Sequence, residues 1–483
     1  MTEIIHDYEM VIGLEVHCEL KTESKIFCGC GTAFGAKPNT QCCPVCTGMP
    51  GALPVLNGKV VEYAIKAGLA TSCDIARYSK QDRKNYFYPD LPKAYQISQF
   101  DLPLCTGGYV DIEGEYGAKR IGITRIHIEE DAGKLVHGKN SDGEEGAFID
   151  LNRCGVPLIE IVSEPDIRSA AEAVAYLKKL RAVLLYTGIS DCRMNEGSFR
   201  CDVNLSVRGK GSKEFGTRTE MKNLNSFQFV AKAIEQEYKR QVKAAESGEK
   251  IIQETRRFDS VSGTTSAMRI KEDADDYRYF PDPDLMPIVT QESVIEAYKV
   301  SLPRLPDERK AEYMEKYGLS GYHSELLITG KQVSDYFDEA VKLTRYPGQL
   351  ASIIISDIFR LTGSDGDGEI RLDRAALAEI SDMLGDDVIN SSTARKLISE
   401  IWENGGSPAA LVEERGLTQV NDRAELERVA GEVIRENEGS VRDFQNGKDA
   451  ALKALMGKAM AKTGGRGNPV MLQEIFDSKL KNN

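Results

Sequence analysis

Four segments of the chain alternate apolar and polar residues with the two-residue period of a β-strand, in which residues i and i+2 point to the same side. In 11–20, Ile12, Leu14 and Val16 alternate with Glu15 and His17. The polar faces carry Glu15, His17 and Glu19; Arg125, His127 and Glu129; Arg200, Asp202 and Asn204; and Arg218, Glu220 and Lys222. This alternation predicts a sheet with one buried apolar face and one polar face.

The polar faces are rich in Glu, Asp, Asn and His, whereas an ordinary solvated face usually carries Lys, Thr and Ser. For any single strand, a wet outer face remains the alternative interpretation. Carboxylates that share one cavity repel each other unless a cation lies between them. Oxygen ligands with one imidazole suit Mg²⁺ or Mn²⁺. If one sheet brings the four strands together, the pattern predicts a divalent-cation pocket.

Two neighbouring glutamates leave one ligand position open. Strict alternation places Glu129 on the same face as Arg125 and His127. A β-bulge at the Glu-Glu-Asp sequence would bring Glu130 to that face instead. Both glutamates therefore remain candidate metal ligands.

Five of the eleven cysteines lie within residues 28–46. Cys28-Gly-Cys30 and Cys43-Pro-Val-Cys46 are two close pairs separated by a loop, the spacing of a tetrahedral zinc site with four thiolate ligands. Cys42 adjoins the second pair and leaves its register open. A site with four thiolates has no free position, so the zinc would be structural. Buried free thiols or a redox pair are the alternatives.

The order of elements predicts an α+β fold followed by helices. Residues 1 to about 290 are rich in strands, with helices expected at about 169–186 and 226–247. A Pro-rich joint at 301–307 precedes a helical region, and the break at 404–408 opens a final helical segment. We expect three domains, at 1–293, 294–405 and 406–483.

Composition and missing motifs exclude several classes of protein. The net charge of −13 excludes a generally basic nucleic-acid coat, although a local basic patch remains possible. No run approaches the ~20 apolar residues of a membrane span, and the N-terminus has no signal-peptide pattern, so we expect a cytoplasmic protein. P-loop, His-Glu-x-x-His, Gly-x-Gly-x-x-Gly and Gly-x-Ser-x-Gly signatures are missing. The chain is therefore not expected to hydrolyse glutamine or peptides by itself.

Long motifs in a fixed order give the chain a family resemblance. They are Val11–His17, Ser79–Asp90, Pro92–Gln99, Ile128–Lys134, Asp150–Arg153, Leu158–Arg168, Gly197–Asp202, Glu220–Ser226 and Asp275–Pro281. With these motifs the chain resembles the GatB family, one of the subunits of the aspartyl/glutamyl-tRNA(Asn/Gln) amidotransferase. The likeness is dense to about residue 290 and looser after it.

The resemblance implies a β-sheet-based cradle domain with a structural zinc knuckle, a helical domain, and a small helical tail domain. It implies a carbon–nitrogen ligase of protein biosynthesis that uses glutamine as its amide-nitrogen donor. ATP with Mg²⁺ would phosphorylate the side-chain carboxylate of misacylated Glu-tRNA(Gln) or Asp-tRNA(Asn). Ammonia from a partner amidase (glutaminase) subunit would then displace phosphate, and a small third subunit would join the other two.

The resemblance also implies site residues. Glu15, His17, Glu130, Asp202 and Glu220 would hold or surround Mg²⁺, which favours Glu130 over Glu129. Lys222 lies on the face of Glu220 and is expected either to contact phosphate oxygens or to pair with that glutamate. The four cysteines match the zinc-bearing branch of the family.

Basic and aromatic residues interleave in 80–99, as expected for a segment that binds phosphates and stacks on a base. We expect ATP or the terminal adenosine of tRNA to contact Lys80, Arg83, Lys84, Tyr88, Lys93 and Tyr95, with Tyr86 nearby. A polar surface loop is the alternative.

The C-terminal segment is locally basic. From residue 448 onward it has seven basic and three acidic residues, which favours contact with the tRNA body. A solvated helix face is the alternative there. For the whole chain, the alternatives are a non-catalytic zinc- and RNA-binding scaffold or a stand-alone metal-dependent hydrolase.

Overall fold

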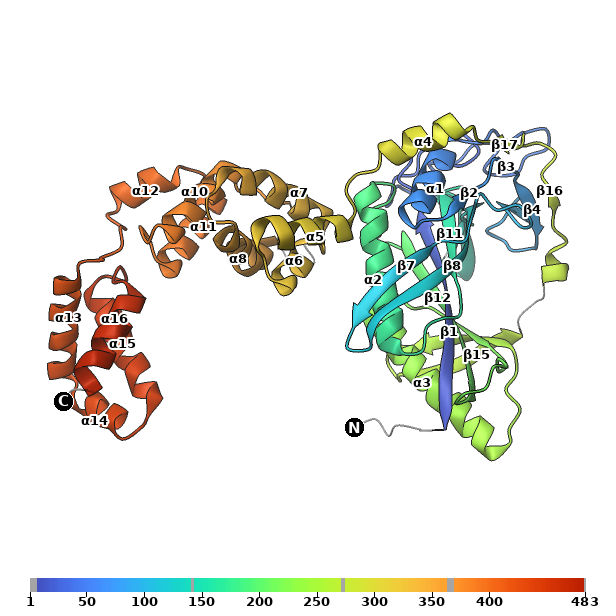
Figure 1. The fold of residues 1–483 in the computed structure, drawn as a ribbon. Helices are drawn as coiled ribbons and strands as arrows, with labels where there is room; N and C mark the ends of the chain where they lie inside the picture. The colour runs from blue at the N-terminus through green and yellow to red at the C-terminus, as the bar shows by residue number, and fades with distance from the viewer. Residues whose placement is uncertain (1–6, 140–142, 271–273, 363–368, 482–483) are drawn as a thin grey trace. The chain divides into compact units, whose positions relative to one another are not determined.

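The computed structural model describes residues 7–139, 143–270, 274–362 and 369–481. The chain divides into two compact units, Met1–Leu305 and Pro306–Asn483. Figure 1 shows that the first unit contains the strands and the second consists of helices. The expected α+β class with a helical C-terminal region is confirmed.

The first unit is built on one ten-stranded sheet in the described residues, with the order β15-β14-β13-β12-β1-β11-β8-β6-β2 and with β7 paired to β8. Neighbouring strands are antiparallel except for β13 and β14. The strands are β1 (Tyr8–Glu19), β2 (Asp74–Ile75), β6 (Cys105–Thr106), β7 (Tyr109–Gly114), β8 (Gly117–Glu130), β11 (Pro157–Ser163), β12 (Phe199–Gly209), β13 (Thr219–Lys222), β14 (Glu254–Asp259) and β15 (Thr264–Ile270).

The four alternating segments of the sequence all lie in this sheet, as β1, β8, β12 and β13. The register pairs Glu15 with Asp202, and Asn204 with Glu220. β11 lies between β1 and β8 and pairs Glu160 with His17. Because paired residues point to the same side, the polar faces of the strands form one continuous polar surface.

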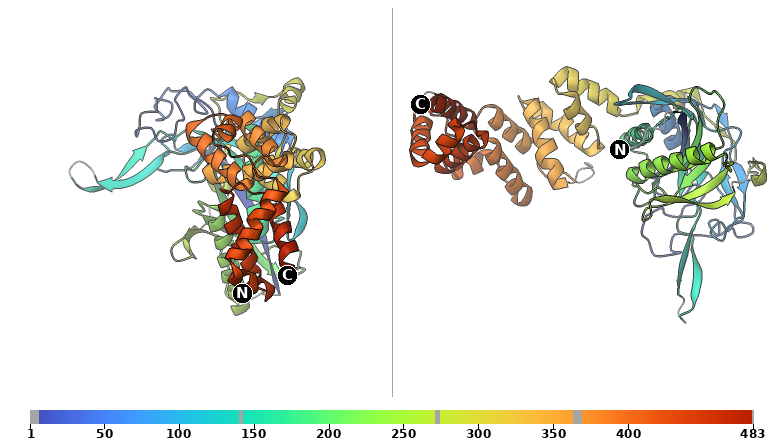
Figure 2. Two further views of the ribbon diagram at one scale, coloured as in Figure 1. Left: turned by 90° about the vertical axis from the view of Figure 1, so that its left-hand side faces the viewer. Right: turned by 90° about the horizontal axis from the view of Figure 1, so that it is seen from below.

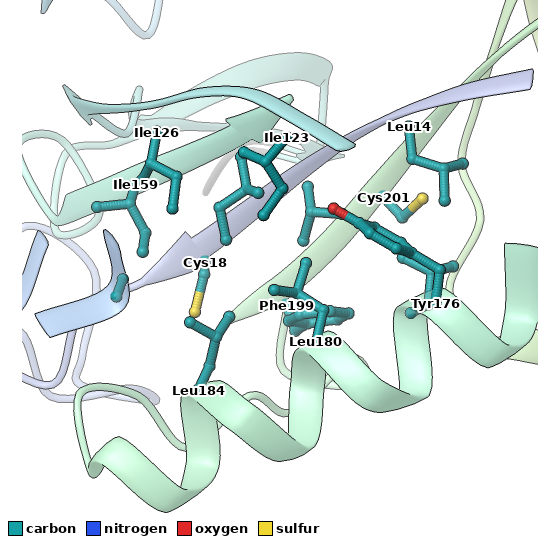
Figure 3. Packing of buried hydrophobic residues seen from close by; sticks show 14 of the residues in the cluster. Leu14, Cys18, Ile123, Ile126, Ile159, Tyr176, Leu180, Leu184, Phe199 and Cys201 are labelled. Atoms are coloured by element: carbon teal, nitrogen blue, oxygen red, sulfur yellow. The ribbon is translucent and has the colours of Figure 1, made fainter. Parts of the chain in front are cut away.

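The opposite, apolar face of the sheet packs on α2 (Ala170–Thr187) and α3 (Phe227–Ser247). Figure 3 shows Tyr176, Leu180 and Leu184 of α2 facing side chains of the strands, among them Phe199 and Cys201. The Ser169 side chain accepts a hydrogen bond from the Glu172 amide, and Gly188 ends α2 with φ +73°. These two helices confirm the ones that the sequence predicts.

Smaller elements surround one end of the large sheet. They are α1 (Gly58–Ala70), β3 (Tyr78–Ser79), β4 (Asp82–Asn85), β5 (Tyr95–Ser98), β9 (Lys134–Lys139), β10 (Glu145–Asp150), η1 (Ala274–Tyr277), β16 (Phe280–Pro281), β17 (Ile288–Val289) and α4 (Glu292–Val300). β4 pairs with both β5 and β16, so the motif at 275–281 lies beside the segment 80–99. The β9–β10 hairpin projects away from the sheet in both views of Figure 2.

The second unit contains two hydrophobic cores. One gathers buried residues between Tyr313 and Val412, and the other gathers residues between Leu426 and Leu480. Its helices are α5 (Pro306–Tyr317), α6 (Gly321–Leu327), α7 (Lys331–Ala340), η2 (Val341–Leu343), α8 (Pro347–Ile353), the π-helix η3 (Ile354–Ile358), α9 (Phe359–Thr362), α10 (Arg374–Gly385), α11 (Ser391–Asn404), α12 (Pro408–Glu414), α13 (Arg423–Glu436), α14 (Glu438–Gln445), α15 (Asp449–Lys462) and α16 (Pro469–Lys481).

Both domain boundaries lie later in the structure than in the sequence-based division. Ile295 of α4 is buried in the core of the first unit, which therefore extends to Leu305 rather than to residue 293. Val412 of α12 is buried with the core of α5–α11, so residues just after 405 pack with the preceding helices. Proline and glycine breaks mark loops, whereas a boundary depends on which core a helix covers.

Within these described ranges, no helix is both long and apolar enough to cross a membrane.

Candidate functional site

One acidic group on the polar surface is formed by Glu15 of β1, Asp202 of β12 and Glu220 of β13. One carboxylate oxygen of each lies within 4.8 Å of the others. Lys222 Nζ lies 2.6 Å from Asp202 Oδ2 and 3.3 Å from Glu220 Oε1. The group therefore has one cation of the chain at its edge.

Two further side chains orient this first group. Asn204 Nδ2 donates a hydrogen bond of 2.9 Å to Glu15 Oε1, and Thr255 Oγ1 donates one of 2.7 Å to Glu220 Oε2. These contacts fix the carboxylates from the neighbouring strands β12 and β14. Three oriented acids from three strands form a donor set that suits Mg²⁺ or Mn²⁺.

A second group lies next to the first along β1 and consists of His17, Glu129 and Glu160. His17 Nε2 lies 3.4 Å from Glu129 Oε1 and 3.4 Å from Glu160 Oε2. His127 Nε2 lies 3.6 Å from Glu160 Oε2. The predicted cation pocket is thus divided into two groups, because Glu15 and His17 are two residues apart and gather different neighbours.

The second group has strongly shifted pKa values. Burial disfavours the imidazolium of His17, but Glu160, Glu129 and Asp202 outweigh it and raise the pKa of His17 to about 9. Burial and the charge of Glu160 raise the pKa of Glu129 to about 7. Burial lowers the pKa of His127 to about 4, so that imidazole is neutral at pH 7. A metal-ligating imidazole is neutral too, so a cation bound at His17 would release its proton.

Lys84 of β4 and an aromatic cluster border the second group. Burial disfavours the ammonium of Lys84, but Tyr279, Glu129 and Glu160 outweigh it and raise its pKa. The Lys84 Nζ lies 4.9 Å from the centre of the Tyr277 ring. Of the predicted nucleotide-binding residues, Lys84 is the one whose charge is directed at the acidic surface.

Glu130 points away from both groups. It is fully buried, its carboxylate lies 2.7 Å from Lys93 Nζ, and its Oε1 accepts a hydrogen bond from the Ile97 amide. The register between β11 and β8 runs unbroken from Val162–Arg125 to Pro157–Glu130. The irregularity lies between Val162 and Ser163, so the Glu-Glu-Asp sequence keeps strict alternation and Glu129 occupies the polar surface.

The other basic residues of 80–99 are held by acids of the chain. Lys80 pairs with Asp82 and Asp101. Arg83 lies 2.7 Å from Asp284 and stacks over the Tyr95 ring at 4.2 Å. Tyr88 is 55% exposed and lies edge-on to Tyr86 at 6.2 Å. The structure therefore does not gather Lys80, Arg83, Tyr88, Lys93 and Tyr95 around one open site.

The four predicted cysteines converge. One sulfur of each of Cys28, Cys30, Cys43 and Cys46 lies within 4.8 Å of the others, with Cys28–Cys46 at 3.5 Å and Cys43–Cys46 at 3.8 Å. A tetrahedral site with Zn–S bonds of about 2.3 Å separates its sulfurs by about 3.8 Å. The donor set fits zinc. Cys42 instead directs its thiol to the Asn39 carbonyl at 3.4 Å, so Cys43 belongs to the set.

Two residues at these sites were not predicted. Glu160 is the one charged residue in the apolar run of β11, and only its pairing with His17 reveals its place. Lys25 is fully buried, with its Nζ 3.4 Å from Cys46 Sγ and 3.1 Å from the Leu151 carbonyl. Its ammonium compensates thiolate charge, and the hydrogen bond of Cys28 with the charge of Lys25 lowers the pKa of Cys46 to about 4.

Comparisons with known proteins cover nearly the whole chain. A family model described as the GatB/GatE catalytic domain matches residues 10–296, and one described as a GatB domain matches residues 335–480. Proteins named as the aspartyl/glutamyl-tRNA(Asn/Gln) amidotransferase subunit designated B are similar throughout. The one from Caldicellulosiruptor saccharolyticus is 54% identical over 480 residues, and the one from Caldicellulosiruptor bescii 53%, each covering 98% of this chain and 99% of the relative. The one from Geotalea daltonii is 50% identical over 477 residues, or 98% of this chain and all of the relative.

Proposed function

The chain belongs to the GatB family of aspartyl/glutamyl-tRNA(Asn/Gln) amidotransferase subunits, and on this premise we propose that it activates the side-chain carboxylate of tRNA-bound glutamate or aspartate. A carboxylate is a poor electrophile, because its leaving group would be oxide. Transfer of the γ-phosphoryl group of ATP to a carboxylate oxygen gives an acyl phosphate and ADP. Attack of ammonia then forms the amide C–N bond and releases phosphate.

The acidic surface of the sheet is the proposed site of this transfer. Divalent cations held by Glu15, Asp202 and Glu220 and by His17, Glu129 and Glu160 would neutralise phosphate charge during the transfer. Lys222 offers a further positive charge at the first group, where it already contacts two of the acids. Lys84 does the same at the second group. These side chains orient anionic substrates that the acids alone would repel.

Ammonia and tRNA call for partners. We infer that an amidase subunit supplies ammonia from glutamine, that a small subunit joins the two, and that the complex takes Glu-tRNA(Gln), Asp-tRNA(Asn) or both. The zinc knuckle has four thiolates and no free position, which supports a structural role. The cytoplasmic location stays a prediction.

The observation that carries the proposal is the convergence of Glu15, Asp202 and Glu220 from three strands, with Lys222 at their edge. The test uses the reconstituted complex with ATP labelled in the γ-phosphate. We expect phosphate release that depends on Glu-tRNA(Gln) or Asp-tRNA(Asn). Release that ignores the aminoacyl-tRNA, or no release from an intact tRNA-binding complex, would favour the scaffold interpretation.

Matched variants connect the activity to the site. Glu220→Gln should abolish tRNA-dependent phosphate release while tRNA affinity stays near that of the wild type. Asp111→Asn removes an acid of the same sheet that pairs on the exposed surface with Arg120, and it should change neither quantity. Loss of tRNA affinity in Glu220→Gln with phosphate release intact would contradict the assignment.

A further inference from the structure

A cavity of about 600 Å³ opens on the polar surface beside the first acidic group. It is lined by parts of β1, β11 and β12, by the loop 215–218 and by Gln253. Glu15 belongs both to its wall and to the acidic group. The volume lies in the range of cavities that hold small ligands and cofactors, about 300–1,000 Å³.

One buried polar atom in the cavity wall has no partner. Asn204 donates its amide nitrogen to Glu15, which leaves its Oδ1 as an acceptor. That oxygen is buried and forms no hydrogen bond within the described residues. A buried polar atom without a partner is costly, so a ligand with an N–H or O–H donor fits this position.

The loop at the mouth of the cavity adds an aromatic ring and a positive charge. Phe215 is 63% exposed, which is unusual for an aromatic residue at a cavity wall. Arg218 is also exposed and forms no ion pair within the ranges that the structure describes. Gly216 fixes the loop against β12, because a Cβ there would lie 2.1 Å from the Val207 carbonyl oxygen.

From these features we propose that this cavity binds ATP, with the adenine ring against Phe215 and the triphosphate directed toward Arg218 and the Glu15–Asp202–Glu220 group. The inference rests on the proposed function and gives its nucleotide a place. An aromatic face takes a purine ring, a guanidinium takes phosphate oxygens, and the acids reach the phosphates through a divalent cation. Lys80 and Arg83, in contrast, are already paired with acids.

The test is photolabelling of the purified complex with 8-azido-ATP, a readout that does not need turnover. We expect the label in the peptide that contains Phe215 and protection by excess ATP. Label confined to residues 80–99, or label that ATP does not displace, would overturn the proposal. Because photolabelling needs no aminoacyl-tRNA, a wild-type complex that fails to activate its carboxylate would overturn the proposed function and leave this result standing.

Kinetics give a second, independent measurement. Phe215→Ala and Arg218→Ala should each raise the KM for ATP about tenfold, the loss expected for one stacking or charge contact. The KM for aminoacyl-tRNA should not change. Lys213→Ala removes a charge from the same loop but outside the cavity wall and should leave both KM values unchanged. A higher KM for aminoacyl-tRNA alone would assign the cavity to the tRNA terminus and contradict an ATP site.

Discussion

Glu129 and Glu130 are neighbours in β8 but lie on opposite sides of the sheet. Glu129 faces His17 and Glu160, whereas Glu130 faces Lys93 and the Ile97 amide. Two-residue periodicity predicts this arrangement, and the family resemblance favours the other glutamate. Glu160 escapes prediction because β11 is apolar on both faces, so its one acid has no alternation to place it. Side-chain direction is local information, but the identity of the neighbouring strand is not.

Glu129→Gln tests the second group at the residue scale. The substitution keeps the shape of the side chain and removes one charged ligand beside His17. Even residues that only support a metal ligand change affinity or activity by about 10–100-fold, so we expect phosphate release to fall on the order of 100-fold or more. Filter binding should give an unchanged affinity for tRNA. Phosphate release near the wild-type rate would exclude Glu129 from the site.

Glu130→Gln should act mainly on stability. It leaves the Lys93 ammonium buried without its carboxylate, and breaking a buried ion pair costs about 3–5 kcal/mol. Denaturant unfolding of the first unit measures this loss. The double variant Glu130→Gln with Lys93→Met is the control and should recover part of it. A Glu130→Gln protein as stable as the wild type would contradict the structural role of this pair.

At the scale of elements, the zinc knuckle illustrates which features the sequence predicts well. Four ligands within residues 28–46 are close in space because they are close in the chain, so their spacing is informative. The choice between Cys42 and Cys43 depends on one turn, in which Cys42 is directed to the Asn39 carbonyl. Lys25 lies near the knuckle sulfurs but lacks the chemistry of a ligand, and no sequence pattern singles it out.

Serine substitutions separate the two neighbouring cysteines. Cys43→Ser removes a thiolate from the four-sulfur set and should release one zinc per chain and lower the thermal midpoint. Cys42→Ser changes a thiol outside the set and should retain zinc. Metal analysis after dialysis gives the zinc content of both variants. Wild-type protein without zinc, or loss of zinc in Cys42→Ser alone, would contradict the assignment.

At the scale of the whole molecule, the positive charge of the C-terminal segment is more local than its composition indicates. The seven basic and three acidic residues from 448 onward are offset by seven acidic and four basic residues in 420–447. Lys462 lies 2.7 Å from Glu436, so part of the charge is neutralised within the unit. Any grip on RNA therefore depends on the exposed lysines that remain.

Truncation after Gln419 tests that grip more cleanly than a cut at 405. It keeps α12, whose Val412 is buried with the preceding helices, and it removes the core formed between Leu426 and Leu480. Because phosphate contacts dominate the affinity for nucleic acids, we expect the KM for aminoacyl-tRNA to rise about tenfold at low salt. The KM for ATP serves as the control and should not change. An unchanged KM for aminoacyl-tRNA would refute the role of this segment.

The most direct test of the central claim is the location of the cations themselves. Crystals of the complex soaked in Mn²⁺ give an anomalous signal at each bound ion. We predict one ion among Glu15, Asp202 and Glu220 and a second among His17, Glu129 and Glu160 in the presence of a nucleotide. Manganese peaks elsewhere in the complex, with neither group holding an ion, would contradict activation of the carboxylate on this surface.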